Sequence, residues 1–279
     1  MTEPTPEARA LPSPGVTGLP ERPAEHEARV VSRAHVLRLQ QRVVEVAIPF
    51  WGAALQAAPP AVEAAAEEFF ALYPERPILD NSGGSGYADC FWIYTAVRLL
   101  AAELIVESGV YKGQTSWLFR RACPRARLYA VDVDLGLRRY RDASIRYHEG
   151  DWTETSVGDV DPTASVCFFD DHVNQARRVR EAYERGFRTL LFDDDLPAET
   201  LYATGGPPVP TIAMLFDQAL EPGERIEWMR HGRRHQYVFN PADTFGARDL
   251  VASRHMTPNL TPIVRQRPQG GLTLVRLRD

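Results

Sequence analysis

The sequence is poor in lysine and in long apolar runs, and its positive charges do not outnumber its negative ones. Lys112 is the one lysine among 32 lysine and arginine residues, and the net charge at pH 7 is −5. Binding to nucleic acid phosphates needs a clustered surplus of positive charge, so we do not expect nucleic acid as a partner. The abundant arginine accompanies a high alanine and proline content and is not by itself interpreted as phosphate recognition.

Cysteine is also scarce. The chain has Cys90, Cys123 and Cys167, without CxxC spacing, and each lies in or beside an apolar segment. This favours buried, reduced thiols over a disulfide. No run of 18 apolar residues occurs, and the N-terminal segment lacks the apolar core of a signal peptide. We therefore expect neither a membrane-spanning helix nor secretion, and we predict a cytoplasmic protein.

Three regions differ in composition. Residues 1–25 contain six prolines and few large apolar side chains, which predicts a disordered tail. Residues 26–79 show helical periodicity at about 25–56 and 61–73 and form a predicted helical cap. These helices would cover the main domain or mediate a homodimer, and the sequence does not distinguish the two. Residues 80–279 form the predicted main domain.

The main domain has the pattern of an α/β fold. Short apolar runs that predict strands lie at 103–107, 127–133, 145–149, 165–169 and 188–192. Helical stretches lie at 88–102, 114–122 and 174–185. This alternation predicts a mostly parallel sheet covered by helices on both faces. A hairpin within 226–239, an irregular segment at 241–271 and an antiparallel last strand at 272–277 complete the expected Rossmann-like fold.

The residues after the first three predicted strands suggest a nucleoside site. Gly109 and Gly113 follow the first strand, where they allow a tight turn before a helix with free N–H groups. Asp132 ends the second strand and could accept hydrogen bonds from ribose hydroxyls. Asp151, next to the aromatic Trp152, follows the third and could meet a purine. A simple turn or a helix cap explains each feature taken singly, and their order along the chain favours the site.

Acidic residues follow the fourth and fifth predicted strands, as FDDH at 169–172 and FDDD at 192–195. Neighbouring strands lie about 4.8 Å apart, so up to five carboxylates would share one edge. Two charges 4 Å apart repel by roughly 4 kcal/mol at an effective dielectric constant near 20. We expect Mg²⁺, or alternatively Mn²⁺ or Ca²⁺, at this edge. The alternative is that the acids cap helices or pair with Arg177, Arg178 or Arg180.

The run ESGVYKGQTS at 107–116 resembles the first motif of class I S-adenosylmethionine-dependent methyltransferases, above all the metal-dependent O-methyltransferases. Asp171-His172 is similar to an Asp-His pair after the fourth strand of catechol O-methyltransferase, whose Asp-Asn pair falls on Asp194-Asp195. Macrocin-type sugar O-methyltransferases and the cephalosporin hydroxylase-like family have similar acidic strand ends. The likeness covers about residues 80–220 and implies a class I methyltransferase sheet.

The resemblance also implies roles for single residues. The residues that would bind S-adenosylmethionine are Glu107, Gly109, Tyr111, Gly113, Asp132, Asp151 and Trp152. The ligands implied for Mg²⁺ or another divalent cation are Asp171, Asp194 and Asp195. The catalytic candidates are Asp171 and His172, which would accept a proton beside the cation or, alternatively, orient a carboxylate.

Two departures from the family narrow the predicted substrate. The lysine that follows the Asp-His pair in catechol-type enzymes falls near Asn174, and the third glycine of the turn is absent. Catechol is therefore not favoured, and we predict O-methylation of a sugar or specialised-metabolite small molecule. The alternatives are a noncatalytic cofactor-binding or scaffold protein and a cephalosporin hydroxylase-like oxygenase. Segments 81–86, 196–210 and 241–271 are expected to form the substrate lid, and Lys112 to be a solvated loop residue.

Overall fold

The computed structural model describes residues 32–198, 207–217, 220–230, 232–265 and 270–279. The tail predicted at 1–25 and part of the predicted lid at 196–210 lie outside these residues. Within the described ranges, no helix has both the length and the apolar character needed to cross a lipid bilayer.

A seven-stranded sheet forms the centre of the molecule, with the strand order β3-β2-β1-β4-β5-β9-β8. Its strands are β1 (Leu104–Ser108), β2 (Arg127–Asp132), β3 (Ile145–Glu149), β4 (Ser165–Phe169), β5 (Thr189–Phe192), β8 (Val251–Met256) and β9 (Thr273–Leu277). β1 to β5 pair in parallel, whereas β9 runs antiparallel to both β5 and β8. The predicted sheet, mostly parallel with an antiparallel C-terminal strand, is confirmed.

β8 is a strand that the sequence analysis did not predict, because it lies within the segment expected to be irregular. It occupies the edge of the sheet and pairs with β9 alone, with an irregular register between Val251 and Ser253. Of its six residues only Val251 is buried, and the other five are partly buried or exposed. An edge strand of this kind carries no continuous apolar run, so its sequence lacks the usual strand signal.

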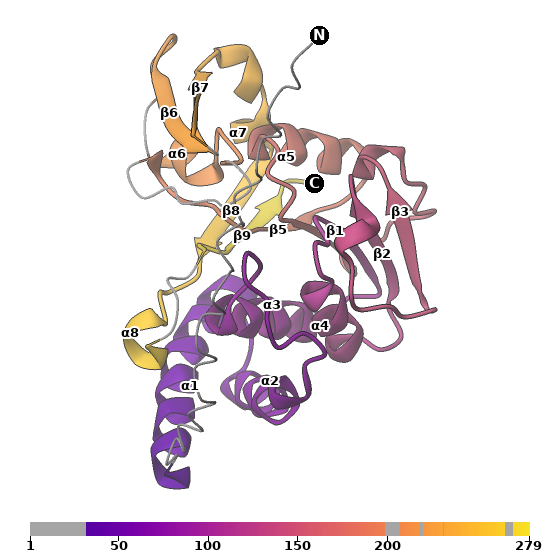
Figure 1. The fold of residues 1–279 in the computed structure, drawn as a ribbon, viewed down its shortest axis with the longest axis vertical. Coiled ribbons are helices and arrows are strands. Elements are labelled where there is room, and N and C mark those ends of the chain that lie inside the picture. Colours follow the sequence, from indigo (N-terminus) through magenta and orange to yellow (C-terminus); the bar gives the residue numbers. More distant parts are fainter. Residues whose placement is uncertain (1–31, 199–206, 218–219, 231, 266–269) are drawn as a thin grey trace, which may run out of the picture.

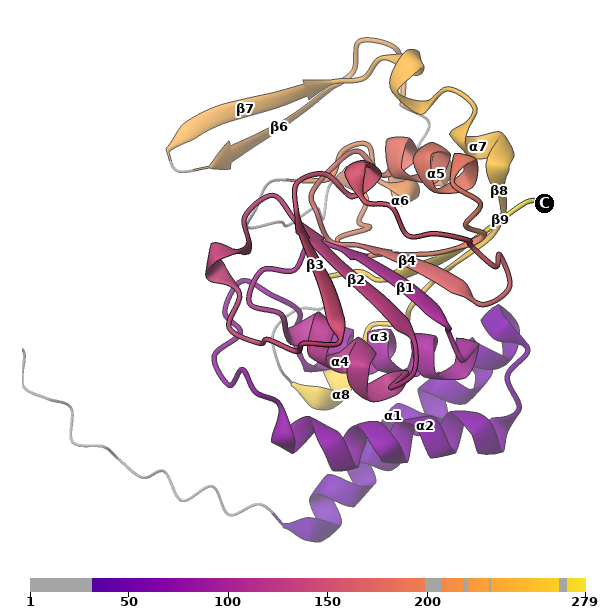
Figure 2. The same cartoon turned by 90° about the vertical axis from the view of Figure 1, so that its right-hand side faces the viewer.

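Helices cover both faces of the sheet (Figures 1 and 2). One face is covered by α3 (Tyr87–Leu100) and α4 (Gln114–Ala122), with α1 (Arg33–Leu55) and α2 (Pro59–Leu72) outside them. The other face is covered by α5 (Gln175–Glu184), α6 (Ile212–Phe216) and α7 (Ala247–Leu250). The short α8 (Thr261–Val264) contacts α1. The two layers of helices are those expected of a doubly wound sheet.

The N-terminal helices share one hydrophobic core with the main domain. Trp51 of α1 and Phe69 of α2 are fully buried against Phe91 and Trp92 of α3. The indole N–H of Trp51 also donates a 3.0 Å hydrogen bond to the hydroxyl of Thr95. The expected covering helices are thus present, and their expected role in a homodimer stays a prediction.

A separate hairpin projects from the α5 side of the molecule (Figure 2). It consists of β6 (Arg225–Arg230) and β7 (Arg233–Val238), which pair antiparallel as expected from the sequence. All three cysteines are buried and free, which confirms the expectation of reduced thiols.

Candidate active site

The site lies where the strand order reverses, between β1 and β4. In open α/β sheets, ligands bind beyond the carboxyl ends of the strands at this point. The turn after β1 contains Gly109, whose φ is +97°. A Cβ atom there would lie 2.3 Å from the carbonyl oxygen of Asp170, the first residue after β4. Only glycine permits this approach, which brings the two strand ends into main-chain contact.

The glycine turn, residues 107–113, is fixed from within by Glu107. Its side chain is fully buried and accepts hydrogen bonds from the hydroxyls of Thr115 and Ser116 in α4. Burial raises the pKa of Glu107 to about 8, and the two hydroxyl donors oppose that rise. The carboxyl group therefore ties β1 to the N-terminal turn of α4, which begins directly after Gly113.

Asp132, for which the sequence predicts a role in ribose binding that stays a prediction, faces this turn. Its Oδ2 atom accepts hydrogen bonds from the main-chain N–H of Val110 at 2.7 Å and of Tyr111 at 2.9 Å. Its Oδ1 atom accepts one from the N–H of Asp134 at 3.0 Å. Tyr111 has a φ of +48°, an unfavourable conformation for a residue with a side chain. The carboxylate of Asp132 stabilises that turn.

Asp151 and Trp152 lie elsewhere in the network. Asp151 forms an ion pair with Arg178 of α5, 2.9 Å from Nη2. Trp152 is fully buried, and its indole N–H donates to Glu181 at 3.0 Å. Its ring packs edge-on against Phe169. The structure therefore encloses the ring that the sequence analysis assigned to adenine, and the cofactor role of both residues stays a prediction.

Arg178 holds three acids together, and we call Arg178, Asp151, Asp171 and Glu181 the arginine-centred group. The guanidinium group is 2% exposed and lies 2.8 Å from Oδ2 of Asp171 and 2.7 Å from Oε2 of Glu181. The hydroxyl of Ser108 also donates to Asp171 at 2.6 Å. Burial tends to raise the pKa values of Asp151 and Glu181, but hydrogen bonds from Arg178 hold both below their usual range.

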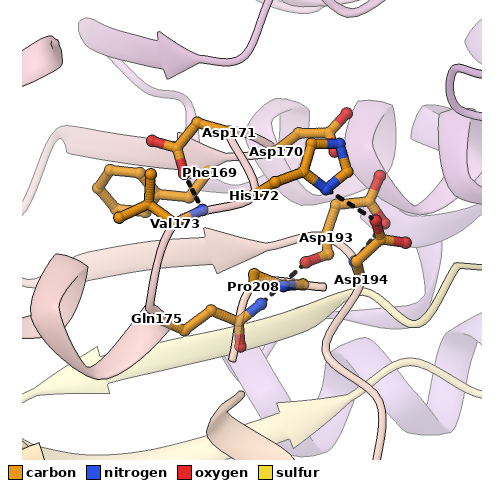
Figure 3. A pocket seen from close by; sticks show the side chains of 9 residues that line it. All are labelled: Phe169, Asp170, Asp171, His172, Val173, Gln175, Asp193, Asp194 and Pro208. Carbon is orange, nitrogen blue, oxygen red and sulfur yellow. Dashed lines mark hydrogen bonds and ion pairs between the residues drawn. The ribbon is translucent and has the colours of Figure 1, made fainter. Parts of the chain in front are cut away.

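Among the described residues, no arginine or lysine forms an ion pair with a second set of acids. Ligand atoms of Asp170, His172 and Asp194, which we call the ligand triad, all lie within 4.8 Å of one another. Nδ1 of His172 is 3.6 Å from Oδ2 of Asp194. Figure 3 shows these three side chains turned toward a common hollow, with Asp171 pointing away. His172 and Asp194 both have positive φ values, +55° and +53°, a conformation that is uncommon for residues with side chains and recurs at active sites.

The surrounding charge is negative. We call Asp89, Asp170, Asp193 and Asp194 the acidic cluster. Burial, and then the charges of neighbouring carboxylates, raise the pKa values of Asp170 and Asp193 well above their usual range. Burial and then Asp89 raise that of Asp194 to about 7. Burial raises that of Asp89 itself to about 6. Four carboxyl groups thus share a region where their ionised forms are disfavoured.

The structure does not bring Asp171 and Asp195 to the ligand triad, in contrast to the set expected from the sequence. Asp171 is turned into the arginine-centred group, so the pairing with Arg178 weighed as an alternative describes this residue. Asp195 is fully buried, and its Oδ1 accepts a 2.6 Å hydrogen bond from the N–H of Ala213 in α6. The side chains of Asp170 and Asp171 thus diverge, and so do those of Asp194 and Asp195.

Sequence reasoning missed Asp89 and did not select Asp170 or Asp193 among the five acids at the strand ends. The signal for Asp89 was an acid in the first turn of an otherwise apolar helix. Its Oδ1 accepts a hydrogen bond from the N–H of Gly270 at 3.1 Å. Lys112, expected to be solvated, is instead 8% exposed.

The donor set fits a divalent cation. Two carboxylate oxygens and one imidazole nitrogen are ligands that Mn²⁺ and other transition metals accept, and the oxygens also suit Mg²⁺. A bound cation would give the buried carboxylates of the acidic cluster the counterion that their ionised forms need. Among the described residues the triad contains one histidine, so it does not form the two-His-one-carboxylate set of non-haem iron oxygenases.

No protein-family model and no curated protein sequence matches the chain. Solved structures do. A structure of CmcI described as "Mg-SAM" is 19% identical over 39% of this chain and 53% of its own, with a TM-score of 0.35, so the chain spans about half of its length. The O-methyltransferase TomG from Streptomyces achromogenes, in complex with SAM, is 14% identical over 86% and 99%, with a TM-score of 0.45.

An O-methyltransferase from Bacillus cereus, in complex with SAH, is 10% identical over 84% of this chain and 100% of its own, with a TM-score of 0.44. Likenesses of this size concern the fold, and the strand order shows the fold without them. The chain has the Rossmann-like sheet that its sequence predicts, with one antiparallel strand inserted next to the last parallel one.

Proposed function

We propose that the chain is an S-adenosylmethionine-dependent O-methyltransferase that uses a divalent cation to methylate a hydroxyl group of a sugar or specialised-metabolite small molecule. The observation that carries the proposal is the direct contact between the two halves of the site. The glycine turn with Asp132 lies on one side, and the ligand triad begins at Asp170, whose carbonyl oxygen touches Gly109.

The chain's own residues divide the work between these halves. Glu107 and Asp132 fix the glycine turn, whose conformation would cradle the methionine and ribose parts of the cofactor. Asp170, His172 and Asp194 would hold the cation. In this proposal they replace the ligand set expected from the sequence, which was Asp171, Asp194 and Asp195. When bound, the cofactor supplies an electrophilic methyl group and the cation lowers the pKa of an acceptor hydroxyl.

The remaining candidates take positioning roles in this proposal. Asp171 orients Arg178 and through it the ends of β3 and β4. His172 is assigned to the cation, because its Nδ1 converges with two carboxylates. Both catalytic candidates of the sequence analysis therefore act by organising the site. Orientation of the acceptor beside the methyl group supplies a large part of the rate in such reactions.

Calorimetry on the whole chain tests the cofactor half. S-adenosylmethionine and S-adenosylhomocysteine should bind, whereas NAD should not, because the turn lacks the Gly-x-Gly-x-x-Gly phosphate motif. If neither sulfonium nor thioether ligand binds, the proposal fails. Binding without turnover on a panel of hydroxylated acceptors would instead support the noncatalytic alternative.

Chelation tests the cation half. Methyl transfer from isotopically labelled cofactor should be lost in excess EDTA and restored by Mg²⁺ or Mn²⁺. Turnover that continues unchanged in EDTA would remove the cation from the proposal and leave the cofactor half standing. The acceptor panel should begin with sugars and polyhydroxylated metabolites and include catechol as the acceptor expected to react poorly.

A further inference from the structure

Lys112, the only lysine in the chain, is buried. Its Nζ atom donates hydrogen bonds to the main-chain carbonyl oxygens of Asp80 at 2.8 Å and Ser82 at 3.3 Å. A buried ammonium group loses its hydration, so it needs acceptors of this kind. The side chain thus joins the glycine turn to the start of residues 80–86, which we call the 80–86 loop.

Tyr111 provides a second attachment to the same loop. Its hydroxyl group donates a 2.9 Å hydrogen bond to the carbonyl oxygen of Ser82, which also accepts from Lys112. Its main-chain N–H is held by Asp132. A Cβ atom on Gly83 would lie only 3.4 Å from the tyrosine hydroxyl, so the loop follows the turn closely. Two consecutive residues of the turn therefore hold one loop.

The far end of the loop reaches the acidic cluster. The hydroxyl of Ser85 lies 3.5 Å from Oδ2 of Asp193, and the N–H of Gly86 donates to Oδ2 of Asp89 at 3.2 Å. The side-chain amide of Asn81 donates to the carbonyl oxygen of Ser85 at 3.0 Å and closes the loop on itself. The 80–86 loop therefore connects the glycine turn to the acidic cluster.

We propose that Lys112 is a positioning residue that clamps the 80–86 loop to the glycine turn and thereby holds Ser85 at the acidic cluster. Only the naming of the cofactor side and the cation side rests on the proposed function; the clamp itself does not. With the loop fixed at both ends, one preformed segment connects the two sides of the site. A preformed segment lowers the ordering cost of binding.

Hydrogen exchange of the loop amides tests the clamp. The amides of Ser82, Gly84 and Gly86 each donate an internal hydrogen bond and so report on the loop. In K112M these amides should exchange at least about tenfold faster than in the wild type, the effect of losing a charge-assisted hydrogen bond. K112R keeps a cation with several donors and should restore most of the protection.

The matched control is R139M. Arg139 is exposed, and its charge also acts on Asp80, so its removal changes the local charge without touching the clamp. R139M should leave the loop amides unchanged. The proposal is overturned if K112M exchanges like the wild type, or if R139M accelerates the loop as much as K112M does.

A second measurement needs no variant. Reductive methylation of the native chain should modify Lys112 at least about tenfold more slowly than in urea, because its amine is enclosed and bonded. Equal rates would overturn the clamp. S-adenosylhomocysteine affinity then separates the two proposals: in K112M it should fall about tenfold at unchanged melting temperature. A wild type that binds none refutes the proposed function, whereas unchanged exchange in K112M refutes the clamp.

Discussion

The arginine-centred group and the acidic cluster lie side by side at the same edge of the sheet, yet they solve the problem of buried acids differently. In the first, one guanidinium group contacts three carboxylates at 2.7 to 2.9 Å. In the second, burial and mutual repulsion raise the pKa values of the carboxyl groups. The first group has its counterion within the chain, and under the proposed function the second would take a cation.

The neighbours Asp170 and Asp171 show how sharply this division is made. Asp171 turns to Arg178, whereas Asp170 turns to His172 and Asp194 (Figure 3). Two consecutive carboxylates thus serve structure and proposed chemistry separately. The acids at one strand end therefore have to be interpreted one by one, because one carboxylate can have an arginine as its counterion while its neighbour has none.

The largest expected effect is a difference in methyl-transfer activity between variants of Asp170 and Asp171. D170N should lower cation-dependent turnover on the order of a thousandfold, because the cation loses a charged ligand that contributes to several kcal/mol of activation. D171N should retain the response of turnover to Mn²⁺ titration, since its side chain lies outside the ligand triad. Steady-state kinetics against metal concentration gives both numbers. A larger loss of metal response in D171N than in D170N would reverse the assignment.

The next effect is on stability. R178M should lower the free energy of unfolding by about 3 kcal/mol, because three partly buried carboxylates lose their buried guanidinium partner. R177M is the matched control, since Arg177 is half exposed and pairs with Glu181 on the helix surface. Its expected cost is about 0 to 0.5 kcal/mol. Urea denaturation measures both, and equal losses would show that the buried network contributes no more than a surface pair.

The pH dependence of stability should follow the acidic cluster. Its folded-state pKa values are raised, so its contribution to stability is full below about pH 4 and is lost as pH rises through about 6 to 7. The melting temperature should therefore fall between pH 5 and pH 8. Mn²⁺ should raise it more at pH 8 than at pH 5, because protons compete with the cation. A metal effect independent of pH would contradict the shared site.

The smallest effect concerns Glu107. Its pKa is raised to about 8, so the stability it contributes is lost as pH rises from about 4.5 through 8. E107Q keeps the shape without the charge and should melt at least about 2 to 4 °C higher than the wild type at pH 8.5. At pH 5 the two should melt alike. Thermal scans at both values decide, and a lower melting temperature of E107Q at pH 8.5 would show that the carboxylate form is the one stabilised.

Most of the fold could be predicted from the sequence. The strands at 145–149 and 165–169 and the helix at 114–122 have the predicted bounds, because each is an apolar or amphipathic segment between clear breaks. β8 could not be predicted, since an exposed edge strand lacks that pattern. The second N-terminal helix starts at Pro59, two residues before the predicted 61–73, because proline fits the first helical positions.

The site was predicted in place but not in detail. The strand ends that carry the acids, the glycine turn and the approach of Asp132 to that turn follow from the order of elements. The choice between Asp170 and Asp171 does not, because it depends on the contacts of Asp171 with Ser108 and Arg178, which no local sequence signal specifies. The burial of Trp152 depends on α5, which is distant in sequence.

The contact of Gly109 with Asp170 has one more consequence. At this junction main chain meets main chain, because the atoms nearest to a Cβ on Gly109 would be main-chain atoms of Asp170 and Asp171. A Cβ methyl group at position 109 would clash with the main chain of Asp170 and push the glycine turn away from the acidic strand end. New acceptor preferences must therefore arise in the loops that surround the junction, while the junction itself leaves no room for variation.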